Sequence, residues 1–63
     1  MNITDIPSYW QFQVYNLHGS QILADRWWNE VNWALEGLTP LEAWKHDPEL
    51  VQKHINVLYE YQI

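Results

Sequence analysis

The chain has 63 residues, eight acidic side chains against three Lys and Arg, a formal net charge of −5 and no Cys. This length holds one domain, and the absence of Cys excludes a disulfide framework or a thiolate metal site. The acidic balance argues against a general nucleic-acid binder, and no stretch approaches the roughly 20 apolar residues that cross a membrane. We therefore expect a single cytoplasmic domain over residues 1–63, without a membrane segment.

Residues 7–18 fit two kinds of secondary structure. Apolar side chains recur at helical spacing, at Ile6, Trp10, Val14 and Leu17. Trp10, Phe12 and Val14 also alternate as in a strand. We predict the helix, because a lone strand in a helical chain has no partner for its backbone groups unless it pairs with another chain. Gly19 then stands where a helix commonly ends.

A second helix is predicted from Gln21, because the Ser20 hydroxyl can cap its first turn. The apolar positions that support it are Leu23, Trp27, Val31 and Ala34 or Leu35. Gly37 supplies the stop, so this helix is expected to run through most of residues 21–36.

The last two helices have the clearest start signals. In Thr39-Pro40-Leu41-Glu42, Thr39 caps, Pro40 occupies the first helical position and Glu42 reaches back to the Thr39 N–H, which predicts a helix over 40–46. Asp47-Pro48 repeats this pattern and predicts a helix from Pro48 to about Tyr61, with an apolar stripe at Val51, Ile55 and Leu58. The expected fold class is all-α, a small bundle of about four helices.

The run from Ala24 to Ala43 reads ADRWWNEVNWALEGLTPLEA. It resembles the toxin-binding domain at the C-terminus of Xre/MbcA/ParS-type antitoxins, without a gap between Trp27 and Ala43. The resemblance extends over residues 18–60 and leaves 1–17 as an additional, helical segment. The residues of the pattern that define the fold are Trp27, Asn32, Leu35, Gly37, Thr39 and Pro40.

Three positions depart from that family. Val31 stands where the family has a Pro, which lets the helix run on through Asn32, and Glu36 replaces the first Gly of a Gly-Gly pair. The third is the family's Gly just after the last helix, which is missing here. The family's helix-turn-helix domain has no counterpart in residues 1–17, so this chain alone is not expected to regulate a promoter. A weaker similarity links Asn32–Glu42 to the tail of integrase-type transposases, whose upstream Arg-Pro-His is missing.

Ten of the 63 residues are aromatic, and a chain this short cannot enclose five indoles. Trp27 fits a core position, whereas Trp28 beside it points about 100° away. Trp33 and Trp44 fall where the family pattern demands no indole, and the C-terminus is crowded with apolar side chains. For these residues a core place and a partner contact are both open. The candidate partner-binding residues are Trp28, Trp33, Trp44, Tyr59, Tyr61 and Ile63.

The resemblance implies an antitoxin-like protein that binds a RES-domain, NAD-consuming toxin and occludes its active site with the last helix and the tail Tyr59–Ile63. A small, acidic inhibitor of a host defence nuclease, carried by a phage or mobile element like an anti-CRISPR protein, is the alternative. A homo-oligomeric structural module is a third. No catalytic, metal or cofactor site is expected, because the chain has no Cys nucleophile and its histidines, His18, His46 and His54, lack ligand-pair spacing.

Overall fold

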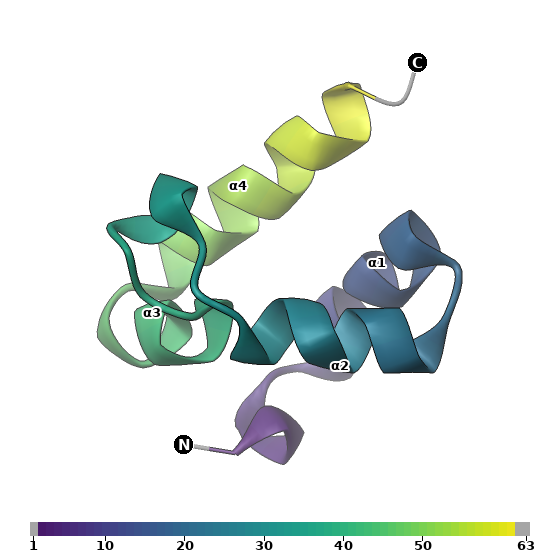
Figure 1. Cartoon of the computed structure of the whole chain (residues 1–63), viewed down its shortest axis with the longest axis horizontal. Helices are drawn as coiled ribbons and strands as arrows, with labels where there is room; N and C mark the ends of the chain where they lie inside the picture. The colour runs from purple at the N-terminus through teal and green to yellow at the C-terminus, as the bar shows by residue number, and fades with distance from the viewer. Residues whose placement is uncertain (1, 62–63) are drawn as a thin grey trace.

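The computed structural model describes residues 2–61, which form four α-helices and two short 3₁₀ turns. Their order is η1 (Ile3–Asp5), α1 (Ser8–His18), α2 (Gln21–Asn29), η2 (Trp33–Leu35), α3 (Pro40–His46) and α4 (Pro48–Glu60). Helices α1 and α3 each pack against α2, and α4 returns from α3 to pack against α1 (Figure 1). Since residues 2–61 contain no β-strand element, the all-α prediction is confirmed.

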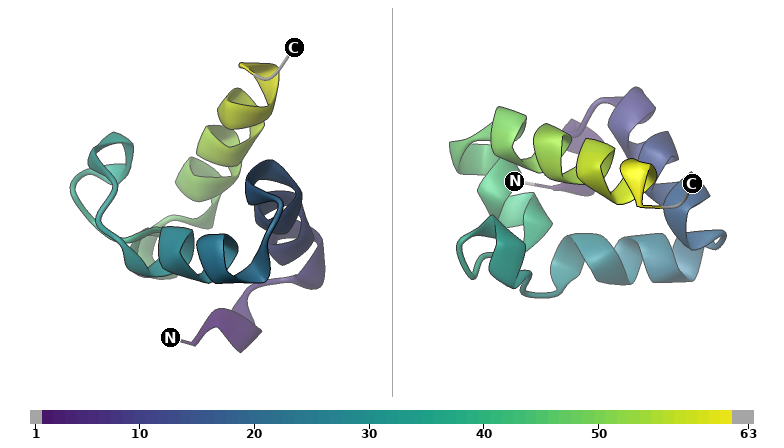
Figure 2. Two further views of the ribbon diagram at one scale, coloured as in Figure 1. Left: turned by 45° about the vertical axis from the view of Figure 1, so that its right-hand side comes forward. Right: turned by 90° about the horizontal axis from the view of Figure 1, so that it is seen from above.

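Each of the four helices, and the turn η2, contributes to one hydrophobic core. Its buried members are Ile6, Val14, Ala24, Trp28, Leu35, Ala43, Trp44, Val51 and Ile55. The segment before α1 is part of this arrangement, because the Gln11 side-chain amide donates to the carbonyl oxygens of Ile3 and Ile6 at 3.1 and 2.7 Å. Seen from above, α4 and α2 lie on opposite sides of the molecule, and η2 stands at one end (Figure 2).

Helix α1 confirms the helical interpretation of residues 7–18. Its inward positions include Val14, which is fully buried, and the partly buried Trp10 and Leu17. Gly19 ends the helix with φ 75°, and its N–H donates to the Tyr15 carbonyl oxygen at 2.8 Å. A left-handed conformation at this position favours glycine, which has no Cβ to clash with the backbone.

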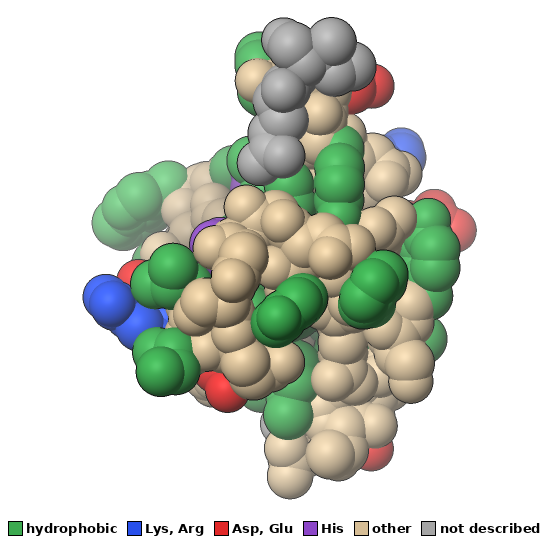
Figure 3. Space-filling view, turned by 90° about the vertical axis from the view of Figure 1, so that its right-hand side faces the viewer, with side chains coloured by type: hydrophobic (Ala, Val, Ile, Leu, Met, Phe, Trp, Pro, Cys, Tyr) green, Lys and Arg blue, Asp and Glu red, His purple; other side chains and the backbone are tan. Residues whose placement is uncertain are grey.

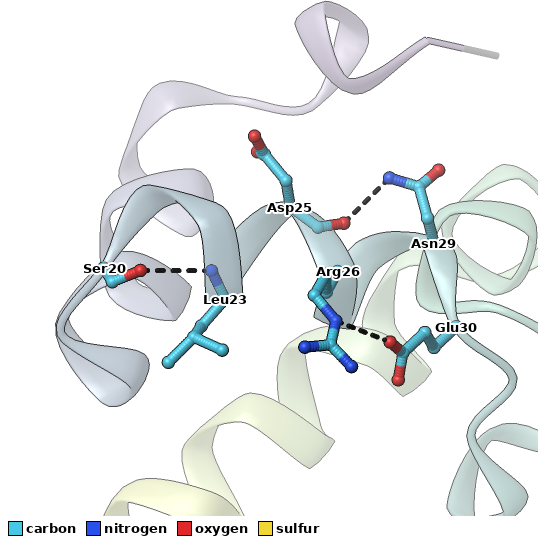
Figure 4. Close-up of polar contacts among 6 residues, drawn as sticks. All are labelled: Ser20, Leu23, Asp25, Arg26, Asn29 and Glu30. Atoms are coloured by element: carbon cyan, nitrogen blue, oxygen red, sulfur yellow. Dashed lines mark hydrogen bonds and ion pairs between the residues drawn. The ribbon is translucent and has the colours of Figure 1, made fainter.

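Helix α2 begins as expected but ends early. The Ser20 hydroxyl accepts the Leu23 N–H at 3.2 Å, which caps the helix (Figure 4). Near the other end, the Asn29 side chain donates to the Asp25 carbonyl oxygen at 2.8 Å, and Glu30 then adopts an extended backbone with φ −102° and ψ 146°. The prediction that this helix continues toward Gly37 is therefore wrong.

The reason for the early end lies in Asn32. Its side-chain oxygen accepts the Ala34 N–H at 3.0 Å, so a local bond opens the separate turn η2 in place of a further helical turn. From that turn Leu35 still reaches the core and is fully buried. Among the apolar residues at 31–35, Leu35 is therefore buried from a 3₁₀ turn, whereas Val31, Trp33 and Ala34 are exposed and mark no longer helix.

Helices α3 and α4 have the predicted starts. The Thr39 hydroxyl accepts the Glu42 N–H at 3.1 Å, and the Asp47 carboxylate accepts the Leu50 N–H at 3.4 Å. One detail differs, because the Glu42 carboxylate accepts a hydrogen bond from the Thr39 hydroxyl at 3.0 Å and not from its backbone N–H. Both helices carry Pro at their first position, where the missing N–H has no intrahelical partner to lose.

Candidate protein-binding surface

Two of the candidate partner-binding indoles lie in the core. Trp28 is 1% exposed and Trp44 is 5% exposed, and their rings meet edge to face with centroids 6.2 Å apart. Burial removes both from the set of side chains that a partner could reach, so a partner role is wrong for them. Trp27, expected in the core, is instead partly buried and packs edge to face on Trp28 at 4.9 Å.

Tyr59 is also structural. It is partly buried, and its hydroxyl donates to the Gln13 carbonyl oxygen at 2.7 Å and lies 2.9 Å from the Gln13 side-chain oxygen. This contact fastens the C-terminal half of α4 to α1, and because the ring is only partly buried, the partner contact of Tyr59 stays a prediction. Tyr61 is 83% exposed just after α4, and Ile63 lies outside the described residues.

Trp33 is the most exposed of the candidate residues that the structure describes, with 86% of its surface accessible. It lies in the segment 30–39, which we call the motif loop. The loop is closed by the Asn32 N–H, which donates to the Leu38 carbonyl oxygen at 2.9 Å, and by the buried Leu35. An exposed indole is thus held on a backbone that is fixed at both ends.

His54 links the motif loop to α2 and α4. Its ring nitrogen Nε2 lies 3.3 Å from the Asn32 side-chain amide nitrogen. Its ring is stacked on Trp27 with centroids 6.3 Å apart and 8° between the planes. Burial lowers the pKa of His54 below its ordinary value. In the neutral state Nε2 can accept the hydrogen bond that the Asn32 amide donates.

Glu36 and Gly37 form a left-handed pair directly after η2. Their φ angles are 62° and 77°, and Glu36 is the one non-glycine residue with positive φ among residues 2–61. A Cβ on Gly37 would lie 3.4 Å from the nearest carbon of the Trp33 ring, so that ring rests close to the Gly37 backbone. The Glu36 side chain is exposed. We call Val31, Trp33 and Glu36, all exposed on the motif loop, the Trp33 surface.

A second set of exposed aromatic side chains lies on α1, and it was not predicted from the sequence. Tyr9, Phe12 and Tyr15 are exposed, and a hollow of about 400 Å³ is lined by Ser8, Gln11, Phe12, Tyr15 and Gln21. Figure 3 shows this side of the molecule, where separate hydrophobic side chains lie among backbone and uncharged polar side chains in the middle, and the charged side chains lie toward the edges. The signal that could have revealed it is the absence of Asp, Glu, Lys and Arg between Asp5 and Asp25.

Within residues 2–61, no three His, Cys, Asp or Glu side chains are gathered as a metal ion would require. Among the described helices, none combines the length and the apolar character needed to cross a bilayer. No family model, curated protein or solved structure matches this chain.

Proposed function

We propose that this chain is a protein-binding module that inhibits a partner enzyme by covering the entrance of its active site, with Trp33 as the central contact. The observation that carries the proposal is an indole 86% exposed on a loop that is fixed at both ends. Tryptophan is among the residues that most often dominate binding energy at interfaces. Because the loop is already ordered, little conformational entropy is lost when a partner buries the ring.

The charges around the Trp33 surface indicate the chemistry of the partner. Glu30 and Glu36 flank the indole in the sequence, and no Lys or Arg occurs between Arg26 and Lys45. Arg26 is itself paired with Glu30 at 3.0 Å, in an exposed ion pair. An acidic rim is complementary to a basic one, so the partner presents positive charge around an apolar recess.

An enzyme that binds a dinucleotide such as NAD has positive groups where the phosphates enter. The RES-domain toxins implied by the resemblance therefore fit the acidic rim. The motif loop is also part of the segment that carries the resemblance, and Trp33 falls where the family pattern demands no indole, so we assign partner specificity to it. Tyr59 holds α4 on α1, so we rest the occlusion on Trp33 in place of this residue. Tyr61 remains a candidate second contact.

The test is inhibition of a RES-domain toxin encoded beside this chain. Increasing amounts of the purified chain are added to the toxin, and NAD consumption is measured. The wild-type chain is expected to abolish the activity near one equivalent. Trp33→Ala should weaken inhibition by roughly 30-fold, which corresponds to the loss of about 2 kcal/mol at a dominant contact.

Ile22→Ala is the matched control. Ile22 is widely exposed, like Trp33, but it lies near the start of α2. The end of α2 that leads into the motif loop is about 10 Å further along the helix. This variant should inhibit like the wild-type chain. Absence of inhibition by the wild-type chain, or equal inhibition by Trp33→Ala, would refute the proposal.

The second candidate function is inhibition of a defence nuclease. It is favoured by the same acidic loop, because a nucleic-acid groove is lined with basic side chains that Glu30 and Glu36 could engage. The discriminating measurement is cleavage of DNA by a host nuclease in the presence of the wild-type chain and of Trp33→Ala. Inhibition here, with no effect on NAD consumption, would favour the nuclease over the toxin.

A further inference from the structure

Helix α1 is apolar on two opposite sides. Trp10, Val14 and Leu17 face the core, whereas Tyr9, Phe12 and Tyr15 are exposed at spacing i, i+3 and i+6. We call these three rings the α1 face. A helix that is apolar all round is normally buried, so in a single copy of this chain α1 lacks a cover on its outer side.

We propose that the α1 face pairs with the α1 face of a second copy of this chain, in a symmetric dimer centred near Phe12. The interface of a two-fold dimer places the same surface patch of both copies against each other. For a chain with a net charge of −5, an interface through most other surfaces would therefore bring carboxylates together. The stretch between Asp5 and Asp25 has no Asp, Glu, Lys or Arg, so self-pairing there avoids that repulsion.

The same charge argument disfavours a different protein on this face. A different protein that binds an acidic chain typically does so through basic groups, which raise both the affinity and the association rate. Helix α1 itself offers these groups no carboxylate. The Trp33 surface offers that complementarity and the α1 face does not. The two surfaces thus suit two kinds of occupant, and the proposal for α1 does not depend on the proposed function.

The shape of the face also suits a second copy. Beside Phe12 and Tyr15 lies the hollow of about 400 Å³, whose rim carries Ser8, Gln11 and Gln21. A protruding ring from one copy can enter the hollow of the other, and the two-fold axis repeats this contact. The uncharged rim can form hydrogen bonds across the interface without burying a charge.

The size of the face predicts a weak dimer. α1 is 11 residues long, which is about 16 Å, and its three rings expose on the order of 300 Å² of aromatic surface. With the neighbouring polar side chains this remains below the roughly 800 Å² per partner of a standard interface. We therefore expect dissociation constants on the order of 10–100 μM.

The test is the solution mass, measured by sedimentation from about 10 μM to about 1 mM protein, a range that brackets the expected constant. The wild-type mass should rise from 7.7 kDa toward twice that value. Phe12→Glu should stay monomeric throughout, because the two-fold axis sets two new carboxylates near each other. Circular dichroism checks that the variant remains helical, which is expected since Phe12 is 61% exposed.

Trp33→Glu is the matched control, with the same added charge at an exposed residue of the motif loop. It should dimerise like the wild-type chain. Phe12→Lys should be monomeric alone and should form a mixed dimer with Phe12→Glu. A wild-type monomer at about 1 mM, a Phe12→Glu variant that dimerises normally, or equal loss of the dimer in Trp33→Glu would each overturn the proposal.

Discussion

Replacing Glu36 by Gly should stabilise the protein. Glu36 has φ 62° and ψ 25° in the motif loop, a left-handed conformation that brings its Cβ close to the following backbone. This conformation costs an L-residue about 1–2 kcal/mol. The Glu36 side chain is exposed, and no hydrogen bond or ion pair within residues 2–61 compensates for that cost.

Glycine removes this steric cost, but it also gives the unfolded chain more conformational freedom, which lowers the free energy of unfolding by about 0.5–1 kcal/mol. The net effect is a free energy of unfolding higher by about 0.5–1 kcal/mol. For a domain of this size, that raises the melting temperature by about 2–8 °C. The assay is thermal and urea unfolding followed by circular dichroism at one fixed protein concentration, since a dimer would make the melting temperature depend on concentration.

Glu36→Ala is the control that isolates the cause. It removes the same carboxylate and the same charge but keeps the Cβ, so its stability should stay within about 0.5 kcal/mol of the wild type. Gly37→Ala applies the argument in reverse at φ 77°, and it should lose about 1 kcal/mol. If Glu36→Ala gained as much as Glu36→Gly, the gain would come from charge, and the steric reasoning would be refuted.

Three further predictions concern the core and its links. Burial in the folded state lowers the pKa of His54. As the pH drops through about 6.5, the unfolded chain therefore binds a proton at His54 before the folded chain does, and the free energy of unfolding should fall. His54→Gln should show a smaller fall between about pH 7.5 and 5.5 in urea titrations, and an equal fall would exclude His54 as the source. Tyr59→Phe removes the hydrogen bond to Gln13 and should lose about 1 kcal/mol in the same assay; an unchanged value would mean that this bond does not hold α4 to α1. Trp28→Ala leaves a large cavity that costs about 3–5 kcal/mol and should largely unfold the chain, whereas Trp33→Ala should change stability by less than about 0.5 kcal/mol; equal losses would contradict their assignment to core and surface.

The helices could be predicted where their signals are local. Thr39 and Asp47 cap the turns that directly follow them, and Pro cannot sit in the interior of a helix, so the starts of α3 and α4 depend on few residues. Gly19 similarly marks the end of α1. These signals need no knowledge of the tertiary structure, which is why the predicted bounds of these elements agree with the observed ones.

Packing decided what local signals could not. Trp27 and Trp28 are neighbours in the sequence, and the apolar spacing indicated Trp27 for the core, whereas Trp28 is the one that is fully buried. The position of α3 settled the question, because Trp44 meets the ring of Trp28. The end of α2 likewise depended on Asn32, whose side chain bonds both the backbone of η2 and His54. Trp33 was a candidate contact because the family pattern demands no indole there, and the structure leaves it 86% exposed. The exposed rings of α1 were missed, because the absence of charged residues between Asp5 and Asp25 is their one sequence signal.

The packing of the indoles also has a spectroscopic consequence. Trp10, Trp44, Trp28 and Trp27 form a continuous series of ring contacts with centroid separations of 6.4, 6.2 and 4.9 Å, and Trp27 is stacked on His54. Rings this close can couple electronically, so we expect these four indoles to dominate the near-ultraviolet circular dichroism of the folded chain. Trp33 belongs to no aromatic pair within residues 2–61, and because it is 86% exposed we expect its emission at the long wavelengths of an indole in water. A binding partner that covers the motif loop should therefore shift the emission of Trp33 to shorter wavelengths. The near-ultraviolet circular dichroism of the other four indoles would show at the same time whether the fold is intact.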